Sequence, residues 1–499
     1  MLQMSTPYTR LAAALMTLGA ALPTGRANAA SHPDRVPARS AARRAAPVAD
    51  SIPLVVTRLM GPAGDALVSN AIPLRRGALR PDGVGAVRLM VEGQAVDAAI
   101  QGTAALHADG SLRSVVVQFR TSLRPGDRAK GWLVLGGGAG KRRGPALSDL
   151  PAYPEAVALP TNADYLISTD LVGETISVSE TRRLGGVWAK YERDFDQWSE
   201  KHWLTSGADW AAGNYYDRAQ IYYAWWVRTG NIEYWRRATL MVIDYRTKYL
   251  EKNNYTSSHH WSQLEGVALH YLLTGDPRSR EAVERTAQLL SSYYRRGALG
   301  KVNHQDMESR IQARSLLAAL LAWEVQNGDP ESGYAKEWAK DLPLMLGQIL
   351  KAQRPDGSFL WGGYCTSSIN YMNGILNDVL IRYYTRFRPD SVIVSSVRRN
   401  ADWLWGTQWR PDGSFNYQSI SCQRNNSGPS RSPDLNGLFV TTYGWLYQQT
   451  GDGRYRDAAD QIFSTLQKGT YLQGSKQFNQ LYTMSYRYLA YRRGSKAGA

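Results

Sequence analysis

The hexapeptide R-P-D-G-S-F occurs twice in the chain, at Arg354–Phe359 and again at Arg410–Phe415. Each copy follows a range with helical periodicity and precedes a long loop that leads into the next such range. Similar junctions recur at a spacing of roughly 45–60 residues, which indicates a repeated helical hairpin. The repeat therefore predicts that the C-terminal three-fifths of the chain is built from paired helices.

Short turns join the two helices of each expected pair. They read T-G-N-I at Thr229, T-G-D-P at Thr274, N-G-D-P at Asn327, R-P-D-S at Arg388 and T-G-D-G at Thr450. The glycine suits the left-handed residue that ends one helix, and the Asp or Asn after it suits the N-cap of the next. The ranges with helical periodicity are 189–203, 214–228, 231–250, 260–274, 277–295, 308–327, 331–352, 368–387, 389–408, 435–449, 453–468 and 476–492.

Six such hairpins, with short turns at one end and long polar loops at the other, describe an (α/α)6 toroid, which we expect over residues 185–495. Residues 51–165 instead show short alternating runs such as S-V-V-V-Q-F, broken by Gly, Pro and Asp. This pattern predicts an antiparallel β-sandwich. His107 stands alone on an expected hairpin, and its simplest interpretation is a surface residue. For residues 154–183 the sequence predicts a connecting strand or loop.

One cysteine follows each copy of the hexapeptide, Cys365 eleven residues after Arg354 and Cys422 twelve after Arg410. Equivalent loops of neighbouring repeats would then carry one thiol each. In an exported protein this predicts a disulfide between the two loops. The alternative is two free, buried thiols.

The first residues have the features of a secretory signal peptide over 1–29. A basic residue, Arg10, precedes the apolar run Leu11–Leu22, and Ala27-Asn28-Ala29 offers a cleavage site. Residues 30–50 are rich in Arg and Ala and predict a disordered linker. No later apolar run is long enough to cross a bilayer, so we expect a periplasmic or secreted protein without membrane insertion.

The net charge of +16 over 499 residues favours a polyanionic partner, against the alternative of a merely basic solvated surface. Export favours an acidic polysaccharide over nucleic acid, for which the chain offers no recognition motif. The 16 Trp and 29 Tyr against 8 Phe suit sugar stacking, although helical cores also use these residues. We expect a monomer without a cofactor.

Taken together, the paired helices, the T-G-D and N-G-D turns and the R-P-D-G-S-F loops resemble the toroid-fold polysaccharide-active enzymes over residues 189–492. These include polysaccharide lyases, several glycoside hydrolase families and uronyl epimerases. The segment before them is similar to the N-terminal sandwich of exo-rhamnogalacturonan-lyase-like proteins. Toroid alginate-lyase-type enzymes carry Asn and His side by side, whereas here four residues separate Asn254 from His259.

The long loops before four expected helices hold the candidate site residues. Lyase chemistry needs a base, for which we propose His260 or His304, an acid, for which we propose Tyr371, and a partner for the sugar carboxylate. The expected carboxylate partners and substrate-binding residues are Asn303, Arg310, Asn370, Trp261, Tyr255, Trp210, Tyr215 and Arg424.

Two other functions remain open. Hydrolysis would need paired carboxylates, which Asp209, Glu265, Asp306, Glu308 or Asp434 could supply. Glu265, one turn into its helix, has the simpler interpretation of a partner for a neighbouring arginine. A non-catalytic glycan-binding protein of an exopolysaccharide system is the third possibility. No i, i+4 His pair or Cys cluster points to a metal site.

Overall fold

The computed structural model describes residues 51–136, 146–292, 307–329, 331–360, 366–420 and 429–493. The chain divides between Ala46 and Pro47, and all described residues belong to the second unit. Several expectations lie outside them: the signal peptide, the linker, Asn303, His304, Arg424 and the disulfide between Cys365 and Cys422.

Eight strands form one sheet in the order β4-β3-β7-β1-β8-β2-β6-β5. They are β1 (Ser51–Arg58), β2 (Gly64–Pro73), β3 (Arg88–Val91), β4 (Gln94–Val96), β5 (Ala99–Gly102), β6 (Ser114–Leu123), β7 (Ala129–Val134) and β8 (Ala156–Leu159). All pairs are antiparallel except β2 with β8. A β-rich N-terminal part is thus confirmed, but two separate facing sheets are not: the described strands make a single sheet.

Two short helices occupy the segment that we expected to be a strand or loop. They are α1 (Ala163–Ser168) and α2 (Val178–Arg183), which follow β8. The side chains of Asn162 and Ser177 cap them, accepting from the backbone N–H of Tyr165 and Glu180. Both helices are too short to give a periodic apolar pattern, so the caps were their only sequence signal.

Helix is found in every range with helical periodicity. The long helices are α3 (Gly186–Ser206), α4 (Arg218–Thr229), α5 (Ile232–Tyr245), α6 (Leu264–Thr274), α7 (Pro277–Leu290), α9 (Ser309–Glu324), α10 (Gly333–Ala352), α11 (Asn370–Arg382), α12 (Ser391–Gln408), α13 (Val440–Thr450), α14 (Gly453–Gly469) and α15 (Ser475–Tyr482). Shorter turns extend them: η2 (Arg246–Leu250), η6 (Tyr383–Phe387), η7 (Pro433–Leu438), η8 (Ser485–Arg487) and α16 (Tyr488–Tyr491).

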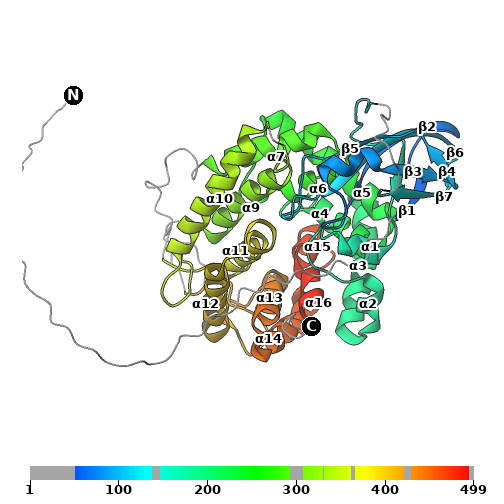
Figure 1. Ribbon diagram of the computed structural model, residues 1–499. Coiled ribbons are helices and arrows are strands. Elements are labelled where there is room, and N and C mark those ends of the chain that lie inside the picture. The colour runs from blue at the N-terminus through cyan, green and yellow to red at the C-terminus, as the bar shows by residue number, and fades with distance from the viewer. Residues whose placement is uncertain are drawn as a thin grey trace, which may run out of the picture. The chain divides into compact units, whose positions relative to one another are not determined.

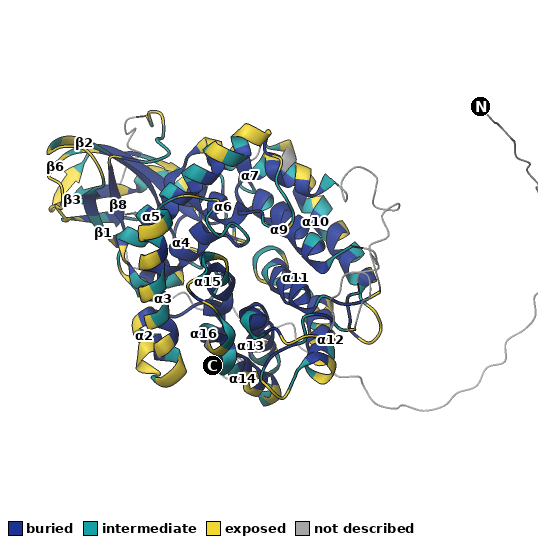
Figure 2. Cartoon of the chain, turned by 180° about the vertical axis from the view of Figure 1, so that it is seen from behind, coloured by how far each residue is buried: buried dark blue, intermediate teal, exposed yellow. Residues whose placement is uncertain are grey.

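The helices form an inner and an outer row (Figure 1). Contacts link α4 to α6, α6 to α9, α9 to α11 and α11 to α13, while α15 contacts both η7 and α4. The outer helices α5, α7, α10, α12 and α14 each pack on the inner helix beside them in sequence. Every residue of α6 is buried, whereas the outer helices expose one face (Figure 2). A helix that is apolar all round has to be surrounded by other elements, as α6 is.

The short turns are capped as the sequence predicts. Gly230, Gly275 and Gly451 end their helices with φ near +70° to +77°. Asp276 and Asp452 then accept from the backbone N–H groups of Arg278 and Arg454. Any side chain at residue 230 would also collide with the backbone of Thr161, so glycine is required there.

The two hexapeptides fold into the same turn. In each, the Asp side chain accepts from the N–H and the hydroxyl of the serine two residues later, in Asp356–Ser358 and Asp412–Ser414. The arginine N–H donates to the carbonyl of that serine at 2.9 Å in both copies. The phenylalanine that ends each copy is buried. The sequence repeat is therefore a structural repeat.

The sheet packs on the C-terminal ends of the inner helices. Tyr271, near the end of α6, accepts through its hydroxyl from the N–H of Ala104 at 2.9 Å. Asn327, just after α9, accepts from the N–H of Leu106 at 2.7 Å and donates to its carbonyl at 3.0 Å. The segment 162–177 also lies at this end, where its carbonyls accept from Arg228, Arg386 and Tyr486. The opposite, N-terminal ends carry the expected site residues.

No helix of the described chain is both long and apolar enough to cross a membrane.

Candidate functional site

Five of the expected site residues meet where the inner helices begin. Tyr215 precedes α4, His260 precedes α6, Glu308 and Arg310 open α9, and Tyr371 lies in the first turn of α11. We call these five residues the rim cluster. They come from four different hairpins, and the side-by-side packing of the inner helices brings them together.

Arg310 is the centre of the rim cluster. Its Nη2 lies 2.8 Å from Oε2 of Glu308, and its Nη1 donates to the hydroxyls of Tyr371, at 3.3 Å, and of Tyr215. Nε2 of His260 is 3.8 Å from the same Glu308 oxygen. Nε of Arg310 is buried and has no hydrogen-bond partner among the described residues. The rim cluster thus holds a cation in a fixed position.

Burial raises the pKa of Tyr371 well above its ordinary value, and the charge of Arg310 only partly opposes this. Its hydroxyl is therefore protonated at neutral pH and can act as a proton donor. The His260 side chain is 48% exposed, against 13% for Glu308 and 5% for Arg310. A base candidate thus stands at the solvent side of the cluster and an acid candidate beneath it.

Two further residues line the rim cluster that the sequence did not single out. The ring of Tyr417 lies 5.7 Å from that of Tyr371, and Nζ of Lys476 lies 4.7 Å from the ring centre of Tyr215. Tyr417 follows the second hexapeptide by two residues, which could have drawn attention to it. Nothing in the sequence marks Lys476. Its ammonium adds a second positive charge near the ring of Tyr215, which the guanidinium of Arg310 also approaches.

An aromatic group lies next to His260. The rings of Trp210 and Trp261 stack at 5.8 Å and 26°, and Tyr249 lies 4.6 Å from the first and 5.1 Å from the second. All three side chains are half-buried. The structure therefore brings together the two expected tryptophans and adds Tyr249, which the sequence placed inside a helix. Half-exposed indole rings provide the apolar faces on which pyranose rings stack.

Two expected substrate-binding residues lie elsewhere. Tyr255 is buried under the guanidinium of Arg285, whose carbon is 4.1 Å from the ring centre, and it contacts no member of the rim cluster in the described structure. Asn370 is fully buried and donates to Gln408 at 3.0 Å and to the carbonyl of Asn416 at 2.8 Å. Its amide holds the loop after α12 in place.

Glu265 lies deeper, in a chain of ion pairs between inner helices. It pairs with Arg382, which lies 2.9 Å from Asp378, and Asp378 lies 2.5 Å from Arg487. This geometry fits the simpler interpretation of Glu265 as the partner of an arginine.

The nearby Asp217 caps α4, and its carboxylate also accepts from the N–H of Gly266 at 2.7 Å. Burial, and next the charge of Glu265, raises the pKa of Asp217 to about 6.

Within the described ranges, no group of three or more His, Cys, Asp or Glu side chains is arranged to hold a metal ion.

No family model matches the chain, and no curated protein matches it. Several solved structures are similar. A sugar epimerase from a ruminal bacterium is 11% identical with a TM-score of 0.39, over 52% of this chain and 75% of that one. An inactive variant of an α-1,6-mannanase from Salegentibacter sp. HEL1_6 is 13% identical with a TM-score of 0.32, over 55% and 69%. A polysaccharide lyase is 10% identical with a TM-score of 0.36, over 87% and 64%.

Proposed function

We propose that the protein is a polysaccharide lyase that cleaves an acidic, uronate-containing chain at the rim cluster. The observation that carries this proposal is the position of Arg310, which contacts Glu308 and both tyrosine hydroxyls within reach of His260. In a β-elimination, a base removes the proton from C5 of the uronate, the C4–O bond breaks, and a C4=C5 double bond forms. The leaving oxygen takes a proton from an acid.

Each step has a candidate residue in the rim cluster. Arg310, assisted by Lys476, would neutralise the sugar carboxylate and so make the C5 proton acidic enough to remove. His260 is half-exposed and its Nε2 lies 3.8 Å from Oε2 of Glu308, so it would serve as the base. Tyr371, whose hydroxyl lies 3.3 Å from Nη1 of Arg310, would donate to the leaving oxygen. Trp210, Trp261 and Tyr249 would hold a neighbouring sugar.

The proposal includes the finer expectations on architecture and location. We infer an (α/α)6 toroid from the order of the inner and outer helices and from the contacts that return from α15 to α4. We also propose export to the periplasm or beyond, a monomeric state and a disulfide between Cys365 and Cys422. The net charge of +16 supports an acidic polymer as the partner.

The test is an incubation with a panel of acidic polysaccharides, followed by ultraviolet absorbance of the unsaturated uronate. His260→Ala should abolish turnover while leaving the circular dichroism spectrum unchanged. If His260→Ala keeps full activity, His260 is not the base.

One observation favours a hydrolase as the second candidate. The raised pKa of Asp217, to about 6, beside the carboxylate of Glu265 is the electrostatic pattern of a general acid with a partner. Both side chains are buried, and Asp217 already accepts two backbone N–H groups. New reducing ends without the absorbance would favour this alternative. Binding without any product would favour the glycan-binding protein.

A further inference from the structure

The rim cluster and the aromatic group of Trp210, Trp261 and Tyr249 are neighbours that differ in charge. His260 of the rim cluster and Trp261 of the aromatic group are consecutive residues. Tyr215 of the rim cluster follows Trp210 by five residues. A glycan chain with one sugar at the rim cluster can therefore place an adjacent sugar on the aromatic group.

The ring of Tyr215 has two cations beside it. Cζ of Arg310 lies 5.6 Å from the ring centre, and Nζ of Lys476 lies 4.7 Å from it. Glu308 pairs with Arg310. Lys476 is exposed and forms no ion pair with any residue that the structure describes. The rim cluster and Lys476 together therefore carry an excess of positive charge, which suits the carboxylate of a sugar.

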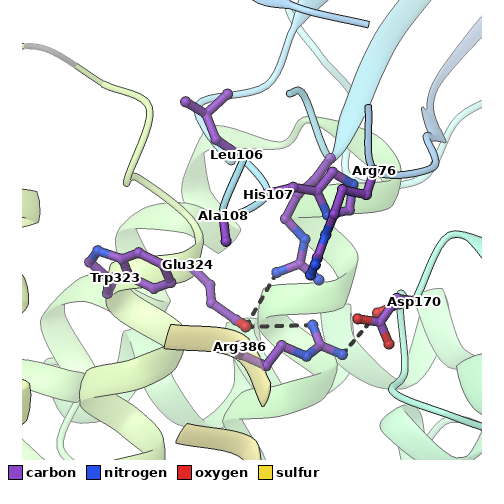
Figure 3. A pocket seen from close by; sticks show the side chains of 9 residues that line it. Arg76, Leu106, His107, Ala108, Asp170, Trp323, Glu324 and Arg386 are labelled. Atoms are coloured by element: carbon purple, nitrogen blue, oxygen red, sulfur yellow. Dashed lines mark hydrogen bonds and ion pairs between the residues drawn. The ribbon is translucent and has the colours of Figure 1, made fainter. Parts of the chain in front are cut away.

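Arginines at the opposite end of the inner helices have a carboxylate within the protein. Oε1 of Glu324 lies 3.3 Å from Arg113 and 3.5 Å from Arg386 (Figure 3). Glu324 ends α9, the helix whose first turn carries Arg310. These two cations are thus neutralised internally, whereas the charge of Lys476 is open to a ligand.

Carboxylates, and no unpaired ring-stacked cation, lie at the aromatic group. Oδ2 of Asp244 accepts from the N–H of Trp210 at 3.0 Å, and its Oδ1 pairs with Lys248. Asp209 is exposed, accepts from the N–H of Ala211 at 3.1 Å and forms no ion pair in the described structure. The hydrogen bond and charge of Asp244, and then the charge of Asp209, raise the pKa of Lys248. No Lys or Arg among the described residues lies over the three rings.

These charges select between a neutral and an acidic sugar. Aromatic faces stack on either kind, because stacking does not depend on a carboxylate at the edge of the sugar. The carboxylate of Asp209 accepts hydrogen bonds, and sugar hydroxyls can donate them. A uronate at the same place would bring a second negative charge close to Asp209 and Asp244, and like charges across an interface oppose binding.

We propose that the substrate alternates a uronate with a neutral sugar. The uronate binds at the rim cluster and Lys476, and the neutral sugar binds on the aromatic group with its hydroxyls toward Asp209. This inference rests on the proposed function, which places the uronate carboxylate at Arg310. It makes chains of consecutive uronates the poorer substrates.

Probes that differ only in charge test the proposal. Polygalacturonate, polyglucuronate and alginate are each used intact, with half of their carboxyl groups reduced to primary alcohols, and fully reduced. Binding to His260→Ala is measured by affinity electrophoresis with the polymer in large excess. For at least one of the three polymers, the half-reduced form should bind about fivefold or more tightly than its intact and fully reduced forms. The net charge of +16 by itself favours the intact polymer, so non-specific attraction predicts the opposite order.

A charge variant identifies the residue responsible. Asp209→Asn, added to His260→Ala, should tighten binding of the intact polymer by about threefold or more, because one like charge is removed. It should leave the half-reduced polymer within about twofold. Asp82→Asn is the matched control, since Asp82 is also exposed but lies in η1 (Pro81–Ala86), between β2 and β3. It should change neither affinity.

A preference for a half-reduced polymer that narrows in Asp209→Asn supports the proposal. The proposal is overturned if no half-reduced polymer binds better than its intact form, or if Asp209→Asn leaves the order and its size unchanged. Ultraviolet absorbance with wild type separates this result from the proposed function. Preferred binding of a half-reduced polymer without any absorbance would refute the lyase and keep the charge preference. Equal absorbance from intact and half-reduced polymer would keep the lyase and refute the alternating substrate.

Discussion

The two ends of the inner helices use the same residue types in opposite ways. At the C-terminal end, Arg228 donates to the carbonyl of Ile176 and pairs with the buried Glu192, and Tyr486 donates to the carbonyl of Val172 at 3.0 Å. At the N-terminal end, Arg310 keeps a buried Nε without a partner in the described structure, and His260 is half-exposed.

The difference follows from what covers each end. The segment 162–177 and the sheet bring backbone carbonyls to the C-terminal end, and these carbonyls accept from the arginines and tyrosines there. Among the described residues, no strand packs on the helix starts that carry the rim cluster. Buried atoms without a partner in the described structure occur at both ends, for example Nε2 of Gln326 at the covered end, so exposure is what separates them. His260 is 48% exposed, whereas Arg228 and Glu192 are fully buried, and we therefore propose the chemistry at the open end.

The largest expected effect comes from one hydroxyl at each end. Tyr371→Phe should lower kcat by about 10²–10⁴-fold, because it removes the proposed general acid. Its ring packing is kept, so the unfolding midpoint should change little. Tyr486→Phe is the matched control: it should keep kcat, but lower the free energy of unfolding by about 1–3 kcal/mol, because Val172 and Gln220 lose their partner. Equal losses of activity in both variants would remove the distinction between the ends.

A second variant tests how much the C-terminal end, which the sheet and segment 162–177 cover, contributes to stability. Arg228→Met should lower the free energy of unfolding by about 3–5 kcal/mol, because Glu192 is left buried without its partner. Urea titration measures this change. Adding Glu192→Gln to Arg228→Met should restore part of the loss, since the unpaired charge is then gone. A loss below about 1 kcal/mol in Arg228→Met would mean that this pair does not hold the end together.

The buried Asp217 predicts a pH dependence. Its pKa is raised from 3.8 to about 6, so the folded state binds its proton more tightly than the unfolded state, by about 3 kcal/mol. The contribution of Asp217 to the free energy of unfolding is complete below pH 3.8 and is lost as pH rises to about 6. In Asp217→Asn the free energy of unfolding should fall less over this interval, as urea titrations at each pH would show. Equal slopes in the two proteins would contradict the raised pKa.

Asp276 is the counterpart of Asp217 at the covered end. Burial acts to raise its pKa, but His270 and Arg246 hold it below its ordinary value. Its contribution to stability is therefore present at neutral pH and is lost as pH falls through the acid range. Asp276→Asn should lower the free energy of unfolding at neutral pH, and urea titrations should show its difference from wild type shrinking as pH falls through the acid range.

The smallest expected effect concerns the aromatic group. Trp261→Ala should raise KM by about 3–10-fold with kcat within twofold, because it removes one stacking face of about 1 kcal/mol. Trp405→Ala is the control, since Trp405 stacks on Trp409 at 4.6 Å on the outer helix α12. It should leave KM unchanged. A fall in kcat without a change in KM for Trp261→Ala would place that ring in the chemistry instead.

Local signals in the sequence were sufficient to predict the helices. The caps at Asp276 and Asp452 and the two hexapeptide turns are set by neighbours in the chain, so the helix ranges and the repeat could be predicted. Strand order is not local, and a single sheet rather than a sandwich could not be predicted from alternating runs.

The candidate site also combines features that neighbouring residues set with features that depend on distant ones. The expected positions of His260, Arg310 and Tyr371 at helix starts follow from periodicity, but their partners lie in other hairpins. Arg382, the partner of Glu265, is 117 residues away in the sequence. His107, which the sequence indicated as a surface residue, is buried with its Nε2 3.0 Å from the carbonyl of Leu74, 33 residues away. Contacts of this range leave no pattern in a single sequence.

The most direct test of the central claim is one assay on three proteins. Wild type, Tyr371→Phe and Tyr486→Phe are incubated with the same panel of acidic polysaccharides, and the ultraviolet absorbance of the unsaturated uronate is followed. We predict that wild type and Tyr486→Phe generate the absorbance on the same substrate and that Tyr371→Phe does not. Product from Tyr371→Phe at the rate of wild type, or new reducing ends without absorbance from wild type, would contradict a lyase site at the rim cluster.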